Sequence, residues 1–517
     1  MNSISSSGNV ESTALMGIDS AKQLSKTLDK TGHKLYTKTV SGDQDQAKQE
    51  HIAYEERIMK TIPWVTALCM LLVMLLTGCF IMGRHATKRE ELGRSEKMRV
   101  LVDKVLMRAN GWVMSEDIVR QIAEAGFNVV SPRLGGDDME RVRQVSEFAE
   151  KYGIYHMPWM RGTLTATEGT KLVWADGTEQ DLYSPNSDEL WEWMTRVIVN
   201  YAKISTEVPS LIGVFLDYEN YAPKKRGNAY SLSYDQRIMG EFATAKGIEL
   251  PELAPAERAA WLEERGLHDK FAEFQISQWR ERCRTVREAV DEINPKFQFC
   301  VYPAPGTPFM REAIWHEWAT EEAPLILADA STYGRRSGFL PHAEALGDNR
   351  RALMERMETV REVDIPFMYI GGIDPVVRGA DPEFSGKNAV MISEVSDGYW
   401  IFYEGPTTGQ PDHEAYWKWF TWANTAIAEE RFEAQHEPRE TPDEWGLTTL
   451  ERKTDKPQIA LYGMKPRMFE MIEEAGKLEV HDLRGNSLKY LRQLDVIVLQ
   501  NFNVALPADS PFSQALR

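Results

Sequence analysis

Two carboxylic acids lie two residues apart near the middle of the chain, in the run GVFLDYE at residues 213–219. The apolar residues before them predict a buried strand, in which side chains at positions i and i+2 share one face. Asp217 and Glu219 therefore point to the same side as Phe215, about 6.6 Å apart along the strand. In a partly dry site two such groups cannot both ionise freely, so one is expected to have a raised pKa. A carboxylic acid that keeps its proton can protonate a leaving group.

The run LDYENY, residues 216–221, resembles the D-x-E ending of strand four in chitinase-type glycosidases. The resemblance implies a barrel-fold glycoside hydrolase in which Glu219 is the general acid and Asp217 steadies an N-acetyl group of the substrate. That family has a further Asp four residues before the Glu, and this position is Phe215 here. Without assistance from the substrate, a second carboxylate must act as nucleophile or base.

Three further acids follow later apolar runs and are candidates for the second carboxylate: Asp329, Asp374 and Glu404. A separation of about 5.5 Å from the general acid would predict retention of configuration, and about 6.5–9.5 Å inversion. We favour Glu404, because the same run supplies Trp400 and Tyr403 for stacking on a sugar, and Asp374 comes next. Each of these acids could instead cap a helix.

Apolar runs alternate with amphipathic segments over residues 98–433, and these elements must position the acids. Such alternation predicts an α/β fold with parallel strands, and eight repeats close into a (β/α)8 TIM barrel whose chemistry lies at the carboxyl ends of the strands. The predicted strands are Val100–Met107, Phe127–Pro132, Ile154–Met160, Leu211–Tyr218, Phe297–Tyr302, Leu325–Ala330, Pro366–Ile370 and Gly398–Tyr403. Predicted helices include Ser115–Ala125, Met139–Tyr152, Glu189–Ala202, Phe271–Ile293, Asn349–Val363 and His413–Ala428.

Arginines and aromatic residues follow the same predicted strands and are expected at the rim that carries the acids. Aromatic rings there can stack on sugars or simply pack inside the barrel. The arginines can neutralise the acids in a structural ion network, or bind an anionic substrate such as a uronate or a sulfated glycan, because their forked donors match carboxylate and sulfate. The candidate substrate-binding residues are Arg108, Arg133, Trp159, Arg161, Tyr302, Tyr333, Tyr369, Trp400 and Tyr403.

Insertions and a second α/β unit are predicted beyond the repeats. Residues 163–185 predict a hairpin over the barrel mouth, and residues 234–267 a helical stretch. Residues 434–456 read as a polar linker. The remaining residues, 457–517, predict the start of a flavodoxin-like unit, with strands at 458–462 and 494–499 and a helix at 466–475. This pattern resembles the opening of the glutamine-amidotransferase-like domain of some bacterial β-galactosidases. The unit is incomplete, so we expect either a truncated C-terminus or completion by another chain, with a possible homo-oligomer.

Residues 61–83 are apolar and uncharged, and are long enough to span a hydrocarbon core of about 30 Å. The polar residues 1–60 predict a disordered leader, unless the true start is Met59. The segment contains LTGC at residues 76–79, which resembles a bacterial lipobox and implies lipidation of Cys79. Basic residues after the segment favour a cytoplasmic barrel, whereas a cleaved signal peptide favours an exported one. We expect a membrane-attached protein with an extracytoplasmic barrel, held by a transmembrane helix or by a lipid.

Length and charge exclude other classes. A chain of 517 residues exceeds the roughly 250–300 that one core supports, so at least two folded units are expected. The net charge of −18 would repel phosphate backbones, so no nucleic-acid partner is predicted. The sequence has no GxxxxGK[ST], GxGxxG or HExxH motif, and no cofactor or metal is predicted. Four cysteines provide no disulfide framework.

The sequence therefore predicts a membrane-attached glycoside hydrolase that cleaves O-glycosidic bonds of an oligo- or polysaccharide by carboxylate acid/base catalysis. One alternative is a barrel that binds glycans without chemistry. Another is a lyase, or a metal-assisted hydrolase that uses Asp217, Glu219 and Asp329 around a divalent ion.

Overall fold

A computed structural model describes the residues from position 89 onward with gaps, and the chain divides into two units at residues 84 and 85. The predicted leader, apolar segment 61–83 and Cys79 lie outside the described residues. Among the helices that are described, none is both long and apolar enough to cross a membrane. The described ranges are 89–103, 114–133, 137–166, 168–220, 228–333, 342–375, 381–403, 413–440, 455–462, 471–472, 475–482 and 494–499.

One parallel sheet forms the centre of the molecule, and its strands follow the predicted runs. The strands lie side by side in the order β3-β2-β1-β11-β10-β9-β8-β7-β4, and every pair of neighbouring strands is parallel. The strands are β1 (Met98–Asp103), β2 (Val129–Ser131), β3 (Tyr155–His156), β4 (Trp159–Arg161), β7 (Gly213–Asp217), β8 (Gln298–Ala304), β9 (Leu325–Asp329), β10 (Phe367–Ile373) and β11 (Gly398–Tyr403).

The two edge strands of that order, β3 and β4, are consecutive in the chain and separated only by Met157 and Pro158. On one side, alternate N–H groups of residues 155–159 donate to carbonyl oxygens of residues 128–132. On the other side, the N–H groups of Ile212 and Phe215 donate to carbonyl oxygens in the same stretch. The sheet therefore closes on itself, and the strand predicted at Ile154–Met160 is interrupted because proline has no N–H to donate.

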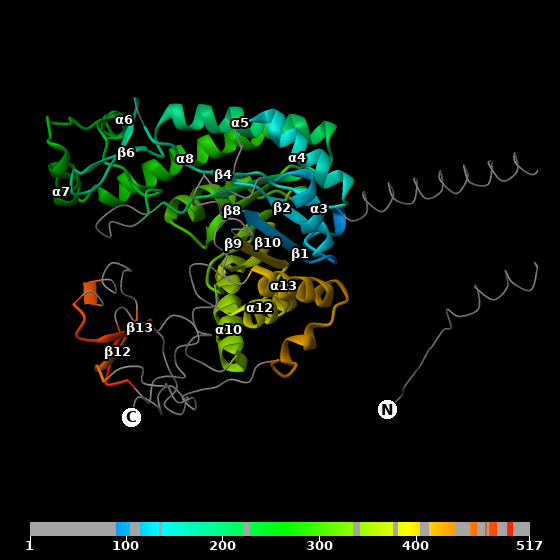
Figure 1. Ribbon diagram of the computed structural model, residues 1–517. Helices are drawn as coiled ribbons and strands as arrows, with labels where there is room; N and C mark the ends of the chain where they lie inside the picture. Colours follow the sequence, from blue (N-terminus) through cyan, green and yellow to red (C-terminus); the bar gives the residue numbers. More distant parts are fainter. Residues whose placement is uncertain are drawn as a thin grey trace, which may run out of the picture. The chain divides into compact units, whose positions relative to one another are not determined.

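Helices follow the strands and cover the outside of this barrel, with α3, α4, α5 and α8 on one side and α10, α12 and α13 on the other (Figure 1). Ser115, Asp138 and Ser187 cap the first three with side-chain oxygens that accept from backbone N–H groups. The helices are α3 (Glu116–Glu124), α4 (Met139–Lys151), α5 (Asp188–Glu207), α8 (His268–Asp291), η4 (Phe309–Ile314), α9 (Trp315–Trp318), α10 (His342–Arg361), α12 (Pro382–Val395), α13 (His413–Ala428) and η5 (Phe432–His436).

Helix α12 was not among the helices predicted from the sequence. Eleven of its residues, from Glu383 to Ser393, are buried. A helix that is buried on nearly all sides has no polar face exposed to solvent. The repeat of apolar residues every 3.6 positions, by which a surface helix is recognised in a sequence, is therefore weak.

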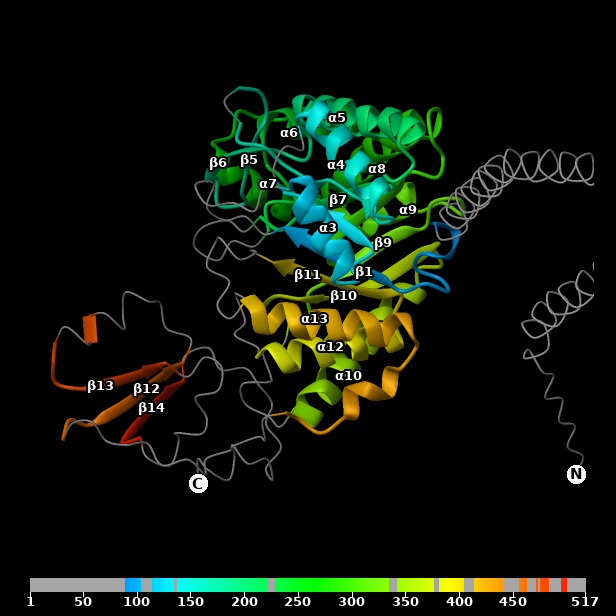
Figure 2. The same ribbon diagram turned by 45° about the vertical axis from the view of Figure 1, so that its right-hand side comes forward.

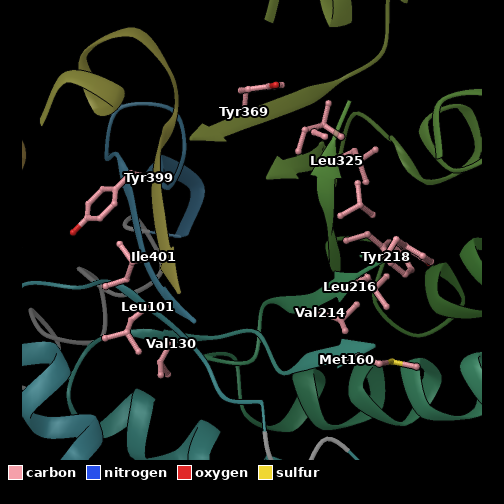
Figure 3. Packing of buried hydrophobic residues seen from close by; sticks show 14 of the residues in the cluster. Leu101, Val130, Met160, Val214, Leu216, Tyr218, Leu325, Tyr369, Tyr399 and Ile401 are labelled. Atoms are coloured by element: carbon pink, nitrogen blue, oxygen red, sulfur yellow. The ribbon is translucent and has the colours of Figure 1, made fainter. Parts of the chain in front are cut away.

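Alternate residues of the strands separate into two apolar clusters, one inside the barrel and one between the strands and the helices. Leu101, Leu216, Tyr218 and Tyr399 belong to the outer cluster, and Figure 3 shows Leu101, Tyr399 and Ile401 on one side of their strands. The inner cluster has Val100, Val102, Phe215, Cys300, Tyr302, Ile326 and Trp400. This period of two decides which side chains enter the barrel.

The predicted insertions are confirmed as elements beside the carboxyl ends of the strands. Strands β5 (Lys171–Val173) and β6 (Glu179–Tyr183) form an antiparallel hairpin. Figure 2 shows β11 pointing toward the side of the barrel where this hairpin lies. The helical stretch contains α6 (Gln236–Lys246), η3 (Pro255–Glu257) and α7 (Arg258–Glu264). Helices α6 and α7 share a small core with Val173 and Phe271.

A separate parallel sheet is described near the C-terminus, in the order β13-β12-β14. Its strands β12 (Gln458–Tyr462) and β14 (Val496–Leu499) coincide with the two predicted there, and β13 (Glu479–Asp482) is additional. Most of the predicted helix 466–475 and of the linker 434–456 lies outside the described residues. Completion of this unit by a second chain stays a prediction.

Candidate active site

The acid pair occupies the carboxyl end of β7, as the period of two predicts. Phe215 lies in the inner cluster, and Leu216 and Tyr218 lie in the outer one, so Asp217 and Glu219 face the barrel interior. The Oδ1 atom of Asp217 accepts the backbone N–H of Glu219 at 2.7 Å. This bond fixes the backbone from which the Glu219 side chain projects.

Burial raises the pKa of Asp217 to about 7, because the ionised form loses its hydration. The nearby Arg161 guanidinium and the bond from Glu219 N–H act in the opposite direction, while the Glu219 charge raises the pKa further. The raised pKa expected within the pair therefore belongs to Asp217, and its main cause is desolvation rather than the neighbouring carboxylate.

Two tyrosines connect Glu219 to the next strands around the barrel. The hydroxyl of Tyr302, on β8, donates to Oε2 of Glu219 at 3.1 Å. The hydroxyl of Tyr333 donates to the Tyr302 hydroxyl at 2.7 Å. Burial and the Glu219 charge both raise the pKa of Tyr302, so the phenol keeps its proton and remains a donor. One carboxyl oxygen of Glu219 is thus held, which leaves Oε1 for another proton or partner.

Asp374 follows β10 and lies on the inner face by alternation with Ile370, which belongs to the inner cluster. It is 2% exposed. Its charge raises the pKa of the Tyr333 phenol, and so does the charge of Glu219. Tyr333 therefore lies within the electrostatic reach of both carboxylates.

Asp329 ends β9 on the opposite face of the barrel wall. Leu325 and Leu327 belong to the outer cluster, and Asp329 continues that alternation. Its carboxylate accepts from the Tyr369 hydroxyl and lies 3.9 Å from Arg356 of α10. The structure therefore does not bring Asp329 or Tyr369 together with Glu219, because both side chains point toward the helices.

The aromatic side chains of strand β11 are buried and do not form an open surface. Trp400 is fully buried, with its ring 4.9 Å from that of Tyr302 and 5.7 Å from that of Tyr333. Tyr403 faces outward, where its hydroxyl contacts Nδ1 of His413 at 2.6 Å. Neither ring is placed to stack on a sugar, because Trp400 is fully buried against the tyrosines and Tyr403 lies outside the barrel wall. Glu404 and Arg108 lie outside the described residues.

Two arginines, one that follows β2 and one at the end of β4, lie over the same indole ring. The guanidinium carbon of Arg133 is 4.5 Å from the centre of the Trp159 ring, and that of Arg161 is 5.5 Å from it. Arg161 also donates to the carbonyl oxygen of Glu219 at 3.1 Å. Among the described residues Arg161 forms no direct ion pair with Asp217 or Glu219, but the charges of Arg161 and Arg133 both lower the pKa of Asp217.

Two residues that sequence analysis did not single out hold the end of β7. Gly162 donates its N–H to the carbonyl oxygen of Asp217 at 3.0 Å, and a Cβ at this position would lie 2.4 Å from the Tyr218 ring. Asn228 donates to the carbonyl oxygen of Tyr218 at 2.8 Å. A glycine directly after a strand that carries Trp159 and Arg161 was the available signal for the first; nothing marked the second.

Among the residues that the structure describes, no group of three or more His, Cys, Asp and Glu side chains is placed to hold a metal ion. The set proposed for a metal-assisted reaction is divided, because Asp329 faces outward while Asp217 and Glu219 face inward.

No protein-family model matches the sequence, and no curated protein matches it. Among solved structures, the chain is similar to the catalytic domain of β-amylase from Paenibacillus polymyxa, with 10% identity, a TM-score of 0.41, and coverage of 63% of this chain and 98% of that one. It is also similar to β-galactosidase from the psychrophilic Marinomonas ef1, with 10% identity, a TM-score of 0.43, and coverage of 81% and 74%. It is similar as well to β-galactosidase from Bacillus circulans sp. alkalophilus, with 11% identity, a TM-score of 0.42, and coverage of 71% of this chain and 59% of that one. These structural neighbours are glycoside hydrolases.

Proposed function

We propose that this protein is a glycoside hydrolase in which Glu219 protonates the glycosidic oxygen of an oligo- or polysaccharide. The observation that carries the proposal is the arrangement around Glu219. It is an inward-facing carboxyl group at the carboxyl end of a barrel strand, with one oxygen held by Tyr302 and its backbone held by Asp217. A positioned carboxylic acid with one free oxygen is suited to general acid catalysis.

Asp374 is our choice for the second carboxylate, as nucleophile or as the base that activates water. It faces inward, and its charge and that of Glu219 both raise the pKa of Tyr333, whereas Asp329 faces the helices. Glu404, favoured from the sequence, remains a second choice because it follows β11 directly. Asp217, protonated at pH values below about 7, supports Glu219 rather than attacking the substrate.

The test is a hydrolysis screen against a panel of oligo- and polysaccharides with wild type and Glu219→Gln. We expect wild type to cleave at least one glycan, and the variant to lose about 100- to 10,000-fold in rate, the usual contribution of a general acid. Unchanged circular dichroism and unchanged glycan binding serve as controls for folding. Full activity in Glu219→Gln would overturn the proposal, and binding without cleavage by wild type would indicate a glycan-binding barrel.

We also propose that residues 61–83 attach the protein to a membrane, with the barrel outside the cytoplasm. The support is the uncharged apolar run and the LTGC motif that ends at Cys79. Mass spectrometry of the membrane-bound protein tests this. A lipid on an N-terminal Cys79 supports a lipoprotein, an intact leader supports a spanning helix, and recovery of the full chain only in the soluble fraction contradicts attachment.

A further inference from the structure

Thr332 lies just after β9 and is fully buried. Its hydroxyl donates to the carbonyl oxygen of Gly372, on β10, at 2.8 Å. Its own carbonyl oxygen accepts a side-chain N–H of Asn388, on α12, at 2.8 Å. One residue therefore connects the segment after β9 both to the neighbouring strand and to helix α12.

The side-chain amide of Asn388 is held from its other end as well. A backbone carbonyl group only accepts, so the amide nitrogen of Asn388 faces Thr332, and its Oδ1 accepts from Asn349, on α10, at 3.1 Å. Both asparagines are buried. A buried network whose donors and acceptors are matched in this way favours one arrangement, because another would leave polar groups unsatisfied. Helices α10 and α12 thus hold Thr332 in one position.

Two glycines of β10 allow the segment after β9 to approach that strand closely. A Cβ at Gly371 would lie 3.1 Å from Oγ1 of Thr332 and 2.6 Å from the Ile392 side chain. A Cβ at Gly372 would lie 2.4 Å from the carbonyl oxygen of Asp329. These distances are shorter than ordinary van der Waals contacts, so a side chain at either position would push the segment away from β10. The glycines leave the space that the Thr332 hydrogen bond needs.

The contacts of this segment lead to both acids of the proposed mechanism. Tyr333, the next residue, donates through its hydroxyl to that of Tyr302, which donates to Glu219. On the other side, the hydroxyl of Thr332 is bonded to β10, the strand that Asp374 follows. The separation of the two carboxyl groups matters in glycoside hydrolysis, and a misplacement of about 1 Å can cost about 100-fold in rate.

We propose that Thr332 is a positioning residue, whose hydroxyl bond to β10 holds the Tyr333 hydroxyl against that of Tyr302. It thereby sets the position of Glu219 relative to β10, the strand that Asp374 follows. Because Thr332 is fully buried, it acts through these residues and not on the substrate. Its effect on cleavage rests on the proposed function, whereas its effect on the two tyrosines does not.

Thr332→Val removes the hydroxyl and keeps the shape, whereas Thr332→Ser keeps the hydroxyl and removes a methyl group. On the best substrate of the glycan screen, Thr332→Val should lower kcat by about 10- to 100-fold and change KM by less than about threefold, because the acids are displaced while other sugar contacts stay. Thr332→Ser should stay within about threefold of wild type. Thr421→Val is the matched control, since that hydroxyl donates to the carbonyl oxygen of Trp417 within helix α13. Full activity in Thr332→Val, or an equal loss in Thr332→Ser, would overturn the inference.

Carbon-13 NMR of protein labelled at the phenol carbon of tyrosine gives a readout that does not depend on turnover. The signals of Tyr302 and Tyr333 are assigned with Tyr302→Phe and Tyr333→Phe. Thr332→Val should shift both signals, and Thr421→Val should shift neither. Unmoved signals in Thr332→Val would overturn the inference even if its activity is low. Shifted signals in a protein that hydrolyses no glycan would refute the proposed function and leave the coupling of Thr332 to the tyrosines standing.

Discussion

Asp217 and Asp329 each end a parallel strand of the same barrel, and burial raises the pKa of both. Asp217 faces the interior, where it supports Glu219 through its backbone N–H. Asp329 faces the helices, where it accepts from Tyr369 and lies near Arg356. The two acids share type, burial and position at a strand end, and they differ in the face of the strand. An acid at the end of a barrel strand can belong to the site only if the alternation of side chains along the strand turns its carboxyl group toward the barrel interior.

The largest effect should come from the inward acid that follows β10. We expect Asp374→Asn to lower the rate of glycoside cleavage by about 1,000-fold, because in the proposed mechanism Asp374 is the second carboxylate, which attacks the substrate or acts as base. Steady-state kinetics on the best substrate of the screen gives the number, and glycan binding by the variant checks that the site is intact. A loss below tenfold would shift the role to Glu404.

Asp217→Asn should lower the rate less, by about 10- to 100-fold, because in the proposed mechanism Asp217 positions Glu219 and does not attack the substrate. The variant should also change the pH dependence of stability. Folded Asp217 has a pKa of about 7 against 3.8 for the ordinary group, so between those values the folded protein holds a proton that the unfolded chain has released. Its contribution to stability therefore falls as pH rises through this window, by at most about 1.4 kcal/mol per pH unit.

Urea unfolding of wild type and Asp217→Asn from pH 4 to 8 measures this slope as a difference between the two proteins. The variant should be stabilised relative to wild type as pH rises. If the difference between them does not vary with pH, Asp217 is ionised in the folded protein throughout the range.

Tyr302→Phe removes one hydrogen bond to Glu219 and leaves the aromatic packing against Trp400 in place. We expect a rate loss of about 10-fold, in keeping with about 1.5 kcal/mol for a hydrogen bond to a charged group. Tyr403→Phe is the matched control, because that hydroxyl contacts His413 outside the barrel wall. Equal effects of the two variants would count against a specific role for the Tyr302 bond.

Substitution of Asp329, which faces the helices, should lower the stability of the fold and leave the rate of cleavage nearly unchanged. Asp329→Ala leaves the Tyr369 hydroxyl without its acceptor in a buried place, so we expect a loss of about 1–3 kcal/mol in the free energy of unfolding. Cleavage by the folded variant should stay within about threefold of wild type. A larger kinetic loss, measured well below the unfolding transition, would contradict the assignment of Asp329 to the outside of the barrel.

The period of two in residues 213–219 predicted which side chains of that strand face inward, and the structure agrees. The same rule applied to β9 and β11 would have placed Asp329 and Tyr403 outside, but only once the strand ends and the inward register were known. Helix α12 escaped prediction because its burial on almost all sides removes the periodic signal.

By itself, the sequence determined the alternation of strands and helices, the hairpin insertion and the Asp217–Glu219 pair, because these depend on local patterns of apolar and polar residues. Only the tertiary structure decided which side chains from distant parts of the chain come into contact. The chain between Glu219 and Tyr302 passes through several helices before barrel closure returns it to the same end, and no local pattern records that approach. Closure likewise places Asp374 on the inner face of the barrel and Asp329 toward the helices, since the face of each side chain is set by strand register in the folded sheet.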